Sequence, residues 1–512
     1  MSCDALRSTR VEGNLPRCVG MLIGIRLYLC HAQSPRLDRA DRWHVRFLVA
    51  ITILLFPQLT YAQQSGSTTN TTTPSRPQIL PNRWAEDWSV LADPRVPREP
   101  FDSLKYIRLS AYDPQTYLSL GADVRERFEA NDTAGFGTPH NRNNDYLISR
   151  TNVFADLRIA NQVQVFVQLQ SDFAPWKTMI APPDQDVLGL EQAFVTVTEP
   201  VGAGTASMRL GRQQMNFDLQ RFVSYRDGPN VRQSYDAVWG DYQNGPWKFI
   251  AFYSQPVQIP DMGERPFGDY SSTAFTFSVV RAQRDVGWGT FSGYFAYYSL
   301  DNAKYLTVTG NERRDSIDLR LAANTGGFDG DLEVMTQTGN IGSDTIRAWA
   351  VGSLSGYTFS DIGWTPRLGF QFDVASGDSN PHDNVLGTFN PLFPSGYYFT
   401  LAGYTGYTNL IHVKPSITVH PTQQLTLMLA VAAQWRETTA DAVYVQGSVP
   451  VAGTAGQPGR YTGTYGQLQL DWAMTSNLSF SVQAVRFDVG QAIQRAGGHN
   501  SDYLGVQIAY RW

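Results

Sequence analysis

Strict alternation of apolar and polar residues runs through this chain from residue 116 to its end. In the last segment, Leu504, Val506 and Ile508 alternate with Gly505 and Gln507. Successive side chains of a β-strand point to opposite faces, so each alternating segment has one apolar face and one polar face. The sequence has no run of roughly 18 apolar residues, which a membrane-spanning helix requires. The pattern therefore predicts an all-β chain.

The alternation divides into eighteen segments, each of which predicts one strand. They cover residues 116–129, 145–159, 163–172, 191–199, 206–215, 235–243, 246–254, 272–284, 288–299, 314–323, 329–338, 345–359, 364–376, 406–420, 424–437, 461–473, 477–488 and 502–512. They are longer than the roughly 5–6 residues of a typical soluble strand. The connections alternate between eight short ones, such as Asn244-Gly245, and nine long ones, such as 216–234 and 377–405.

This layout favours a barrel in a membrane over a soluble sandwich or propeller, which has no need for short turns at one rim and long loops at the other. Outer-membrane barrels have an even number of strands, short periplasmic turns and long external loops. We therefore predict that residues 116–512 form an 18-stranded antiparallel transmembrane β-barrel of the outer-membrane type. Its apolar face meets lipid, its polar face lines the lumen, and closure leaves no unpaired edge.

The composition agrees with a folded extracytoplasmic protein. Charged residues make up only 17% and aromatic residues 12% of the chain, with 44 glycines, which argues against disorder and coiled coil. The three cysteines (Cys3, Cys18 and Cys30) all precede residue 62. The rest of the chain therefore has no disulfide framework, Cys-ligated zinc site or thiol nucleophile.

The N-terminal residues predict export. The apolar run 47–56 follows Arg39, Arg42 and Arg46 and precedes Thr60-Tyr61-Ala62, the layout of a secretory signal peptide rather than of a buried core segment. We assign residues 1–62 to it, and a misplaced start codon explains the unusual residues 1–38. Residues 63–81 predict a disordered linker and residues 82–115 a short periplasmic segment. The expected location is the outer membrane of a Gram-negative cell, with both termini periplasmic.

The alternation also predicts which side chains line the lumen. Arginines cluster on the first strands and in the loop after residue 215, which we expect to fold over or into the same wall. The residues expected along the substrate pathway are Asp123, Arg125, Arg127, Arg150, Asp156, Arg158, Arg212, Arg221, Arg226, Arg232, Arg367 and Lys414. Arginine binds carboxylates bidentately, so the cluster suggests a guanidinium ladder for carboxylates. The alternative is that facing Arg/Asp pairs only neutralise each other.

Other chemistry is poorly supported. No Gly-x-Ser-x-Gly, His-Glu-x-x-His or phosphate-binding glycine loop occurs, so neither catalysis nor a cofactor is expected. Asp373, Asp378, Asn380 and Asp383 are rich in oxygen, as calcium sites are, but their spacing is not that of an EF-hand loop. A solvated external loop is the preferred interpretation, and no metal site is predicted.

Several motifs resemble the alginate export family of outer-membrane porins. They are Asn82-Arg83-Trp84, Glu86-Asp87-Trp88, Leu91 to Pro94, Tyr117 to Glu129, Arg209 to Gln213, Arg226 to Asp236 and Ser376 to Pro394. The resemblance covers residue 82 to the end. It implies a monomeric 18-stranded barrel that passes an acidic polysaccharide outward through an Arg-lined lumen without energy input. The implied partners are that polysaccharide, outer-membrane lipid and periplasmic export machinery, with no nucleic acid.

The leading hypothesis is a passive outer-membrane channel for an anionic polysaccharide, with alginate or an alginate-like polymer as the substrate. One alternative is a nutrient-uptake porin for small anionic solutes, which genes for polymer synthesis nearby would argue against. A second is an outer-membrane barrel enzyme, which a conserved Ser/His pair in homologues would support. A third is a structural or adhesion barrel with a plugged lumen, which conductance in planar bilayers would reject.

Overall fold

The computed structural model describes residues 75–132, 135–138 and 144–512. The signal peptide predicted for residues 1–62, and residues 63–74 of the predicted linker, lie outside the described residues.

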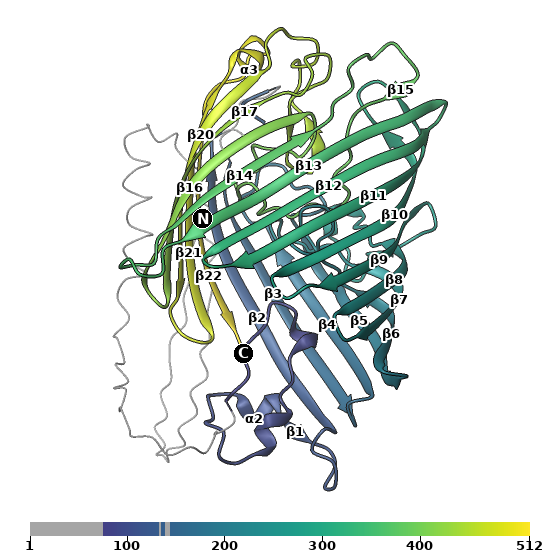
Figure 1. Cartoon of the computed structure of the whole chain (residues 1–512), viewed down its shortest axis with the longest axis vertical. Helices are drawn as coiled ribbons and strands as arrows, with labels where there is room; N and C mark the ends of the chain where they lie inside the picture. Colours follow the sequence, from purple (N-terminus) through teal and green to yellow (C-terminus); the bar gives the residue numbers. More distant parts are fainter. Residues whose placement is uncertain (1–74, 133–134, 139–143) are drawn as a thin grey trace, which may run out of the picture. The chain divides into compact units, whose positions relative to one another are not determined.

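Eighteen antiparallel strands form one closed barrel, which confirms the predicted fold (Figure 1). Each strand pairs with the next along the chain, and β2 also pairs with β22 through residues 123–131 and 503–511. The barrel strands are β2 (Tyr117–Asn131), β3 (Asn144–Ile159), β4 (Val163–Phe173), β5 (Asp186–Val201), β6 (Gly204–Gln213), β7 (Tyr235–Asn244), β8 (Trp247–Pro256), β9 (Phe275–Asp285), β10 (Gly289–Lys304), β11 (Thr309–Thr325), β12 (Phe328–Ile341), β13 (Asp344–Thr358), β14 (Arg367–Ala375), β16 (Leu410–Thr422), β17 (Leu425–Trp435), β20 (Tyr461–Ala473), β21 (Leu478–Val489) and β22 (Ser501–Arg511).

The remaining elements are short and lie before the barrel or in its loops. Before β2 come η1 (Arg83–Ala85), η2 (Ser89–Ala92), α2 (Asp102–Lys105) and β1 (Ile107–Arg108), and β1 pairs with residues 117–118 of β2. The loops carry η3 (Asp261–Gly263), β15 (Val385–Leu386), β18 (Tyr444–Val445), η4 (Gln446–Ser448), β19 (Val449–Pro450) and α3 (Gln491–Arg495). Among the described residues, no helix is long and apolar enough to span a membrane.

The connections differ between the two rims of the barrel. Most of those at one end, which we call the long-loop rim, are long, and those at the other end, the short-turn rim, are mostly tight. Two connections expected to be long are tight, because only residues 305–308 join β10 to β11 and only 342–343 join β12 to β13. Polar residues such as Asn311 and Arg313, which we expected in a loop, continue β11. A paired backbone satisfies its hydrogen bonds whatever its side chains are, so apolar alternation alone understates strand length.

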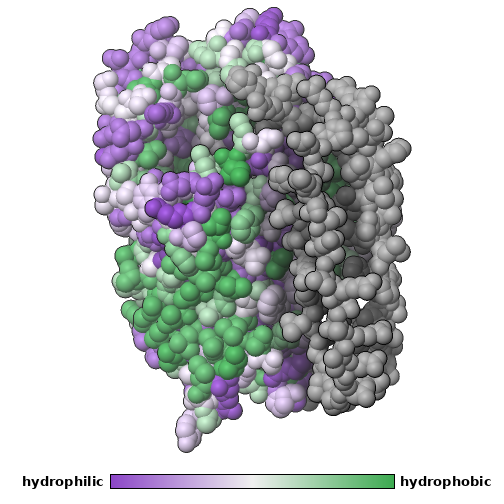
Figure 2. All heavy atoms as spheres, turned by 180° about the vertical axis from the view of Figure 1, so that it is seen from behind, coloured by the Kyte–Doolittle hydropathy of each residue, from purple (hydrophilic) through white to green (hydrophobic). Residues whose placement is uncertain are grey.

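The side chains of the wall follow the predicted phase. On β3 and β4, Val153 and Val167 are 48% and 39% exposed, whereas their inward neighbours Asn152 and Gln168 are buried. Figure 2 shows a continuous hydrophobic surface over the lower part of one face, below a more hydrophilic end. Exposed apolar side chains are unfavourable in water and favourable in lipid, so this exterior fits a membrane.

A pair of neighbouring residues on β20 tests this inside–outside phase. Leu468 is 52% exposed on the outer face, whereas Gln469 points inward and donates a hydrogen bond of 2.7 Å to Asp471. Leu468→Arg should reduce the free energy of unfolding in lipid vesicles by about 2–4 kcal/mol, the cost of arginine at the bilayer midplane. Gln469→Arg should cost little, because its side chain remains in the lumen. Equal costs in urea titrations of the two variants would contradict the assigned phase.

Candidate functional site

Two loops of the long-loop rim fold into the lumen and join there. They are residues 214–234, between β6 and β7, and residues 376–409, between β14 and β16. Val223 and Phe393 form a parallel bridge, and the Phe393 amide donates to the Phe222 carbonyl at 2.9 Å. Gly228 and Gly396 touch so closely that a Cβ on Gly228 would lie 2.6 Å from the Gly396 Cα. We call the two joined loops the lumen partition.

One side of the partition packs as an apolar core against the inner wall. The Phe393 ring lies 5.2 Å from Tyr235 of β7, 5.0 Å from Phe277 of β9 and 6.2 Å from Tyr298 of β10, measured between centroids. Phe217 extends the same cluster. We expected a polar face to line the lumen, and over β7 to β14 this is wrong, because inward apolar side chains pack there against the loops. The two loops supply the apolar partners that inward-facing aromatic residues need.

The other side of the partition is held by arginines of β2 and β3, which we call the arginine anchor (Arg125, Arg127 and Arg150). Arg125 donates to the Asp227 carbonyl at 3.1 Å, and Arg127 donates to the Gly228 carbonyl at 2.6 Å. Arg150 donates to the Asn230 carbonyl at 2.7 Å and the Pro229 carbonyl at 2.8 Å. These guanidinium groups therefore bind the tip of the loop, residues 227–230, instead of facing open solvent.

Two side chains of the loop complete this attachment. The Asn230 amide donates to the carbonyls of Ser149, Phe173 and Asp184 at 2.9–3.1 Å. The Asp227 carboxylate accepts a hydrogen bond of 2.7 Å from Arg232 and another from Arg150. Burial alone would raise the pKa of Asp227, but the charges of Arg232, Arg150 and Arg125 outweigh it and hold this pKa well below its ordinary value.

Most of the other predicted pathway residues also point inward, and carboxylates neutralise them. Arg221, fully buried, contacts Asp331 at 3.2 Å as well as Glu333, and Arg232 lies 3.5 Å from Glu191. The remaining inward pairs are Arg158 with Asp156 at 3.0 Å, Arg367 with Asp329 at 2.8 Å and Asp123 with Arg83 of the N-terminal segment. The alternative that we weighed, mutual neutralisation, describes these pairs.

Arg212 is not in the lumen, which corrects our prediction. It lies in the same phase of β6 as Leu210 and Met208, both 56% exposed on the outer face, and pairs there with Asp236 at 2.8 Å and with Asp269. A bulge in β5 lets both Glu191 and Gln192 face inward, and Ala193 and its partner Arg212 then face outward. The loop that follows β6 turns into the barrel only after this residue.

Several inward cations make no ion pair with a carboxylate among the described residues. The Arg226 guanidinium donates to the Leu392 carbonyl at 2.9 Å and lies 5.2 Å from the centre of the Phe393 ring. Lys414 donates to the Phe399 carbonyl at 3.2 Å. Arg209, which we did not predict as a pathway residue, stacks 3.7 Å from the Trp84 ring. Its alternation with Met208 and Leu210 was the signal for its inward direction.

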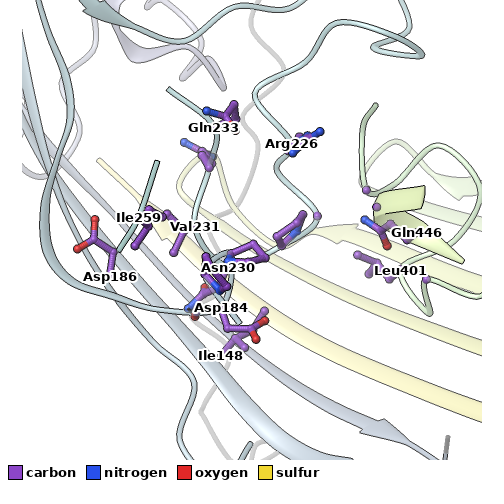
Figure 3. Close-up of a pocket in the computed structure, with 18 of the residues that line it drawn as sticks. Ile148, Asp184, Asp186, Arg226, Asn230, Val231, Gln233, Ile259, Leu401 and Gln446 are labelled. Carbon is purple, nitrogen blue, oxygen red and sulfur yellow. Dashed lines mark hydrogen bonds between the residues drawn. The ribbon is translucent and has the colours of Figure 1, made fainter. Parts of the chain in front are cut away.

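The partition separates two cavities. The one toward the long-loop rim, with a volume of about 650 Å³, is lined by Arg226, Asn230, Arg232, Leu401 and Gln446, among others (Figure 3). In this view Arg226 and Gln233 lie above Asn230, and Leu401 and Gln446 lie to its right. The one toward the short-turn rim, about 450 Å³, is lined by Trp84, Arg158 and Arg209. An unpaired arginine therefore faces each cavity.

The N-terminal segment, residues 75–106, packs into the mouth of the barrel at the short-turn rim. Arg158 donates to the carbonyls of Trp84 and Glu86 at 2.6 and 2.9 Å, and Arg83 pairs with Asp123 on β2. The Lys105 amine is buried between the rings of Trp88 and Phe154, 5.4 and 5.0 Å from their centres, without a hydrogen-bond partner. This segment narrows the lumen below the second cavity.

The attachment of the loop tip can be tested at Asn230. Asn230→Ala removes three donated bonds to buried carbonyls, and each unsatisfied group costs roughly 1–3 kcal/mol. If losing one such bond lowers the free energy of local opening by this amount, hydrogen exchange in residues 224–233 should accelerate about 5- to 150-fold. Asn216→Ala is the matched control, because Asn216 lies in the same loop and makes a single long contact of 3.5 Å to Asn82. Unchanged exchange in the Asn230 variant would contradict the anchoring.

Docking of the N-terminal segment should depend on pH through Lys105. Burial and the charge of Arg83 lower the pKa of Lys105 from 10.5 to about 7 in the docked state. Between pH 7 and 10 the undocked segment therefore binds more protons, so docking should strengthen as the pH rises. A nitroxide on Ala92→Cys, in a protein produced without residues 1–62 and therefore with no other cysteine, should become less mobile over this range. In a spin-labelled protein that also carries Lys105→Met, the pH-dependent loss of mobility should disappear. The same loss of mobility with and without Lys105→Met would show that Lys105 is not its cause.

Comparisons with known proteins agree with this architecture. The alginate export family model matches residues 116–507. Among solved structures, Acinetobacter baumannii OccAB4 has a TM-score of 0.52 at 10% identity, covering 78% of this chain and 98% of its own. Pseudomonas aeruginosa OccK9 (OpdG) has 0.52 at 10%, covering 77% and 98%. The P. aeruginosa outer membrane protein opdK has 0.51 at 10%, with the same coverage.

The structural matches establish the fold alone, since their identity is low. A comparison with curated protein sequences gave no significant match. The family model spans nearly the entire barrel, from the first residues of β2 to β22. The chain therefore belongs to the alginate export family, and its barrel is that of an outer-membrane channel.

Proposed function

We propose that this protein is a passive outer-membrane channel for an anionic polysaccharide, with an alginate-like polyuronate as the leading substrate. The family and the barrel support an outer-membrane channel. The observation that carries the choice of an anion is the unpaired guanidinium of Arg226 at the larger cavity, with Arg209 at the smaller one. The described N-terminal segment and Trp512 lie together at the short-turn rim, which we place in the periplasm.

The electrostatics favour weak binding of the substrate. The arginine anchor donates to the carbonyls of residues 227–230 and to Asp227, so these charges hold the loop. Arg226 and Arg209 remain without a carboxylate partner on either side of the partition. Basic side chains along a pore favour anions, and conduction requires binding that is weak at each site. A polyanion can then exchange its carboxylates from one guanidinium to the next.

Uptake of a small anionic solute is the second candidate, and the size of the larger cavity favours it. A volume of about 650 Å³ lies within the range of roughly 300–1,000 Å³ that is typical of sites for small molecules. The two functions differ in their dependence on length. A polymer channel should be blocked more strongly by a hexauronate than by a monouronate, whereas a small-solute channel should bind both similarly.

Arg226 provides the test of anion binding. In planar bilayers, an oligouronate of six residues should block the current more strongly than a neutral hexasaccharide. Arg226→Gln should raise the half-blocking concentration of the oligouronate about tenfold, near the lower end of what a charged hydrogen bond contributes. Arg265→Gln is the matched control, because it removes the same charge from a loop side chain that is 63% exposed. Equal block by charged and neutral oligomers, or an unchanged Arg226 variant, would contradict the proposal.

A further inference from the structure

An apolar groove of about 780 Å³ crosses the outer wall over β6 to β11. Its floor is made by small outward-facing residues in register, Gly240 with Ala251 and Ala282 with Gly293. Larger apolar side chains border it, and several of them are strongly exposed: Phe249 (44%), Val280 (63%), Phe295 (47%), Ile317 (57%) and Leu319 (66%). The inward-facing residues of these strands lie behind the groove, on the lumen side of the barrel wall. The groove therefore opens toward the space that lipid occupies.

A cation lies beside this groove, on the side of the short-turn rim. Arg284 is the next outward residue after Ala282 on β9, roughly 7 Å along the strand, and is in register with Trp247 and Phe291. Its guanidinium lies 5.1 Å from the centre of the Trp247 ring, and that ring stacks on Phe249 at 5.7 Å. Within the described ranges, no carboxylate oxygen lies within 4.0 Å of it. Aromatic residues of this kind mark the interface between lipid and water in outer-membrane barrels.

We propose that this groove and Arg284 form a binding site for one anionic glycerophospholipid. An acyl chain fills the groove over Gly240 and Gly293, and the headgroup phosphate accepts hydrogen bonds from Arg284. Arginine suits phosphate because its planar group donates two parallel hydrogen bonds. Charge complementarity argues against a second copy of this chain, since packing two such walls would bury the Arg284 guanidinium against aromatic rings without a counter-charge. The site depends only on the location in the membrane and is independent of what the lumen carries.

Native mass spectrometry of delipidated protein in a neutral detergent tests this proposal. The added lipids are phosphatidylglycerol and phosphatidylcholine with the same acyl chains. The wild type should retain one phosphatidylglycerol with at least a fivefold preference over phosphatidylcholine. Arg284→Gln should abolish the preference, because it should weaken phosphatidylglycerol more than phosphatidylcholine, whose choline cation already offsets the charge of its phosphate. This separates the contribution of the headgroup from that of the acyl chain.

Two glycine substitutions test the groove itself. Gly240→Leu fills it at little steric cost, since a Cβ there would lie 4.0 Å from its nearest neighbours, and it should weaken both lipids at least fivefold. Gly466→Leu is the matched control, because this glycine lies on β20, outside the groove, with no heavy atom within 4 Å of an added Cβ. Heat-modifiable gel mobility checks that each variant folds.

Three results would overturn the proposal. The first is an equal preference for phosphatidylglycerol in the wild type and in Arg284→Gln. The second is an equal loss of lipid in the Gly240 and Gly466 variants. The third is a wild-type dimer that Gly240→Leu dissociates, because the groove would then hold a second copy of the chain.

Discussion

The pairing of β2 with β22 closes the sheet, and the rest of the structure follows from that closure. Residues 123–131 of the first barrel strand match residues 503–511 of the last, so no strand edge faces lipid. The match is offset, because β2 continues to Tyr117 beyond the end of β22. The exposed edge of β2 receives β1 at residues 117–118, and the N-terminal segment packs beside it, with Lys105 close to Gly121. The register that closes the barrel therefore also leaves the part of β2 against which the N-terminal segment packs.

The two inward loops convert a wide barrel into a divided lumen by two different kinds of contact. Phe393 and its aromatic neighbours attach the partition through apolar burial, which is not directional. The arginine anchor attaches it through hydrogen bonds to the carbonyls of residues 227–230. Buried guanidinium groups need such partners, because an unpaired buried charge is costly. The charges that hold the loop are therefore not free to bind cargo, and only a few cations remain for that task.

Most of the fold could be predicted from the sequence, because alternation shows which face of each strand is apolar. It predicted the strand number and the inward direction of residues such as Arg125, Arg150 and Lys414. It did not reveal that the arginine anchor binds the backbone of residues 227–230, since contacts between a wall and a loop leave no periodic signal. Arg212 was misplaced because it was grouped with the arginines of the loop that follows, although it shares the outward phase of Met208 and Leu210 on β6. The apolar packing inside the lumen was not predicted, because alternation does not show that loops fold inward and pack against the inward-facing aromatic residues.

The lumen should conduct with a modest preference for anions, set by unpaired arginines around a fixed partition. The reversal potential of the wild-type channel in a tenfold gradient of KCl measures this preference most directly. We expect a reversal potential whose sign shows that chloride permeates more readily than potassium. Its magnitude should decrease as both salt concentrations are raised, because the charges are screened. A preference for potassium, or the absence of any ionic current through the purified protein, would contradict this expectation.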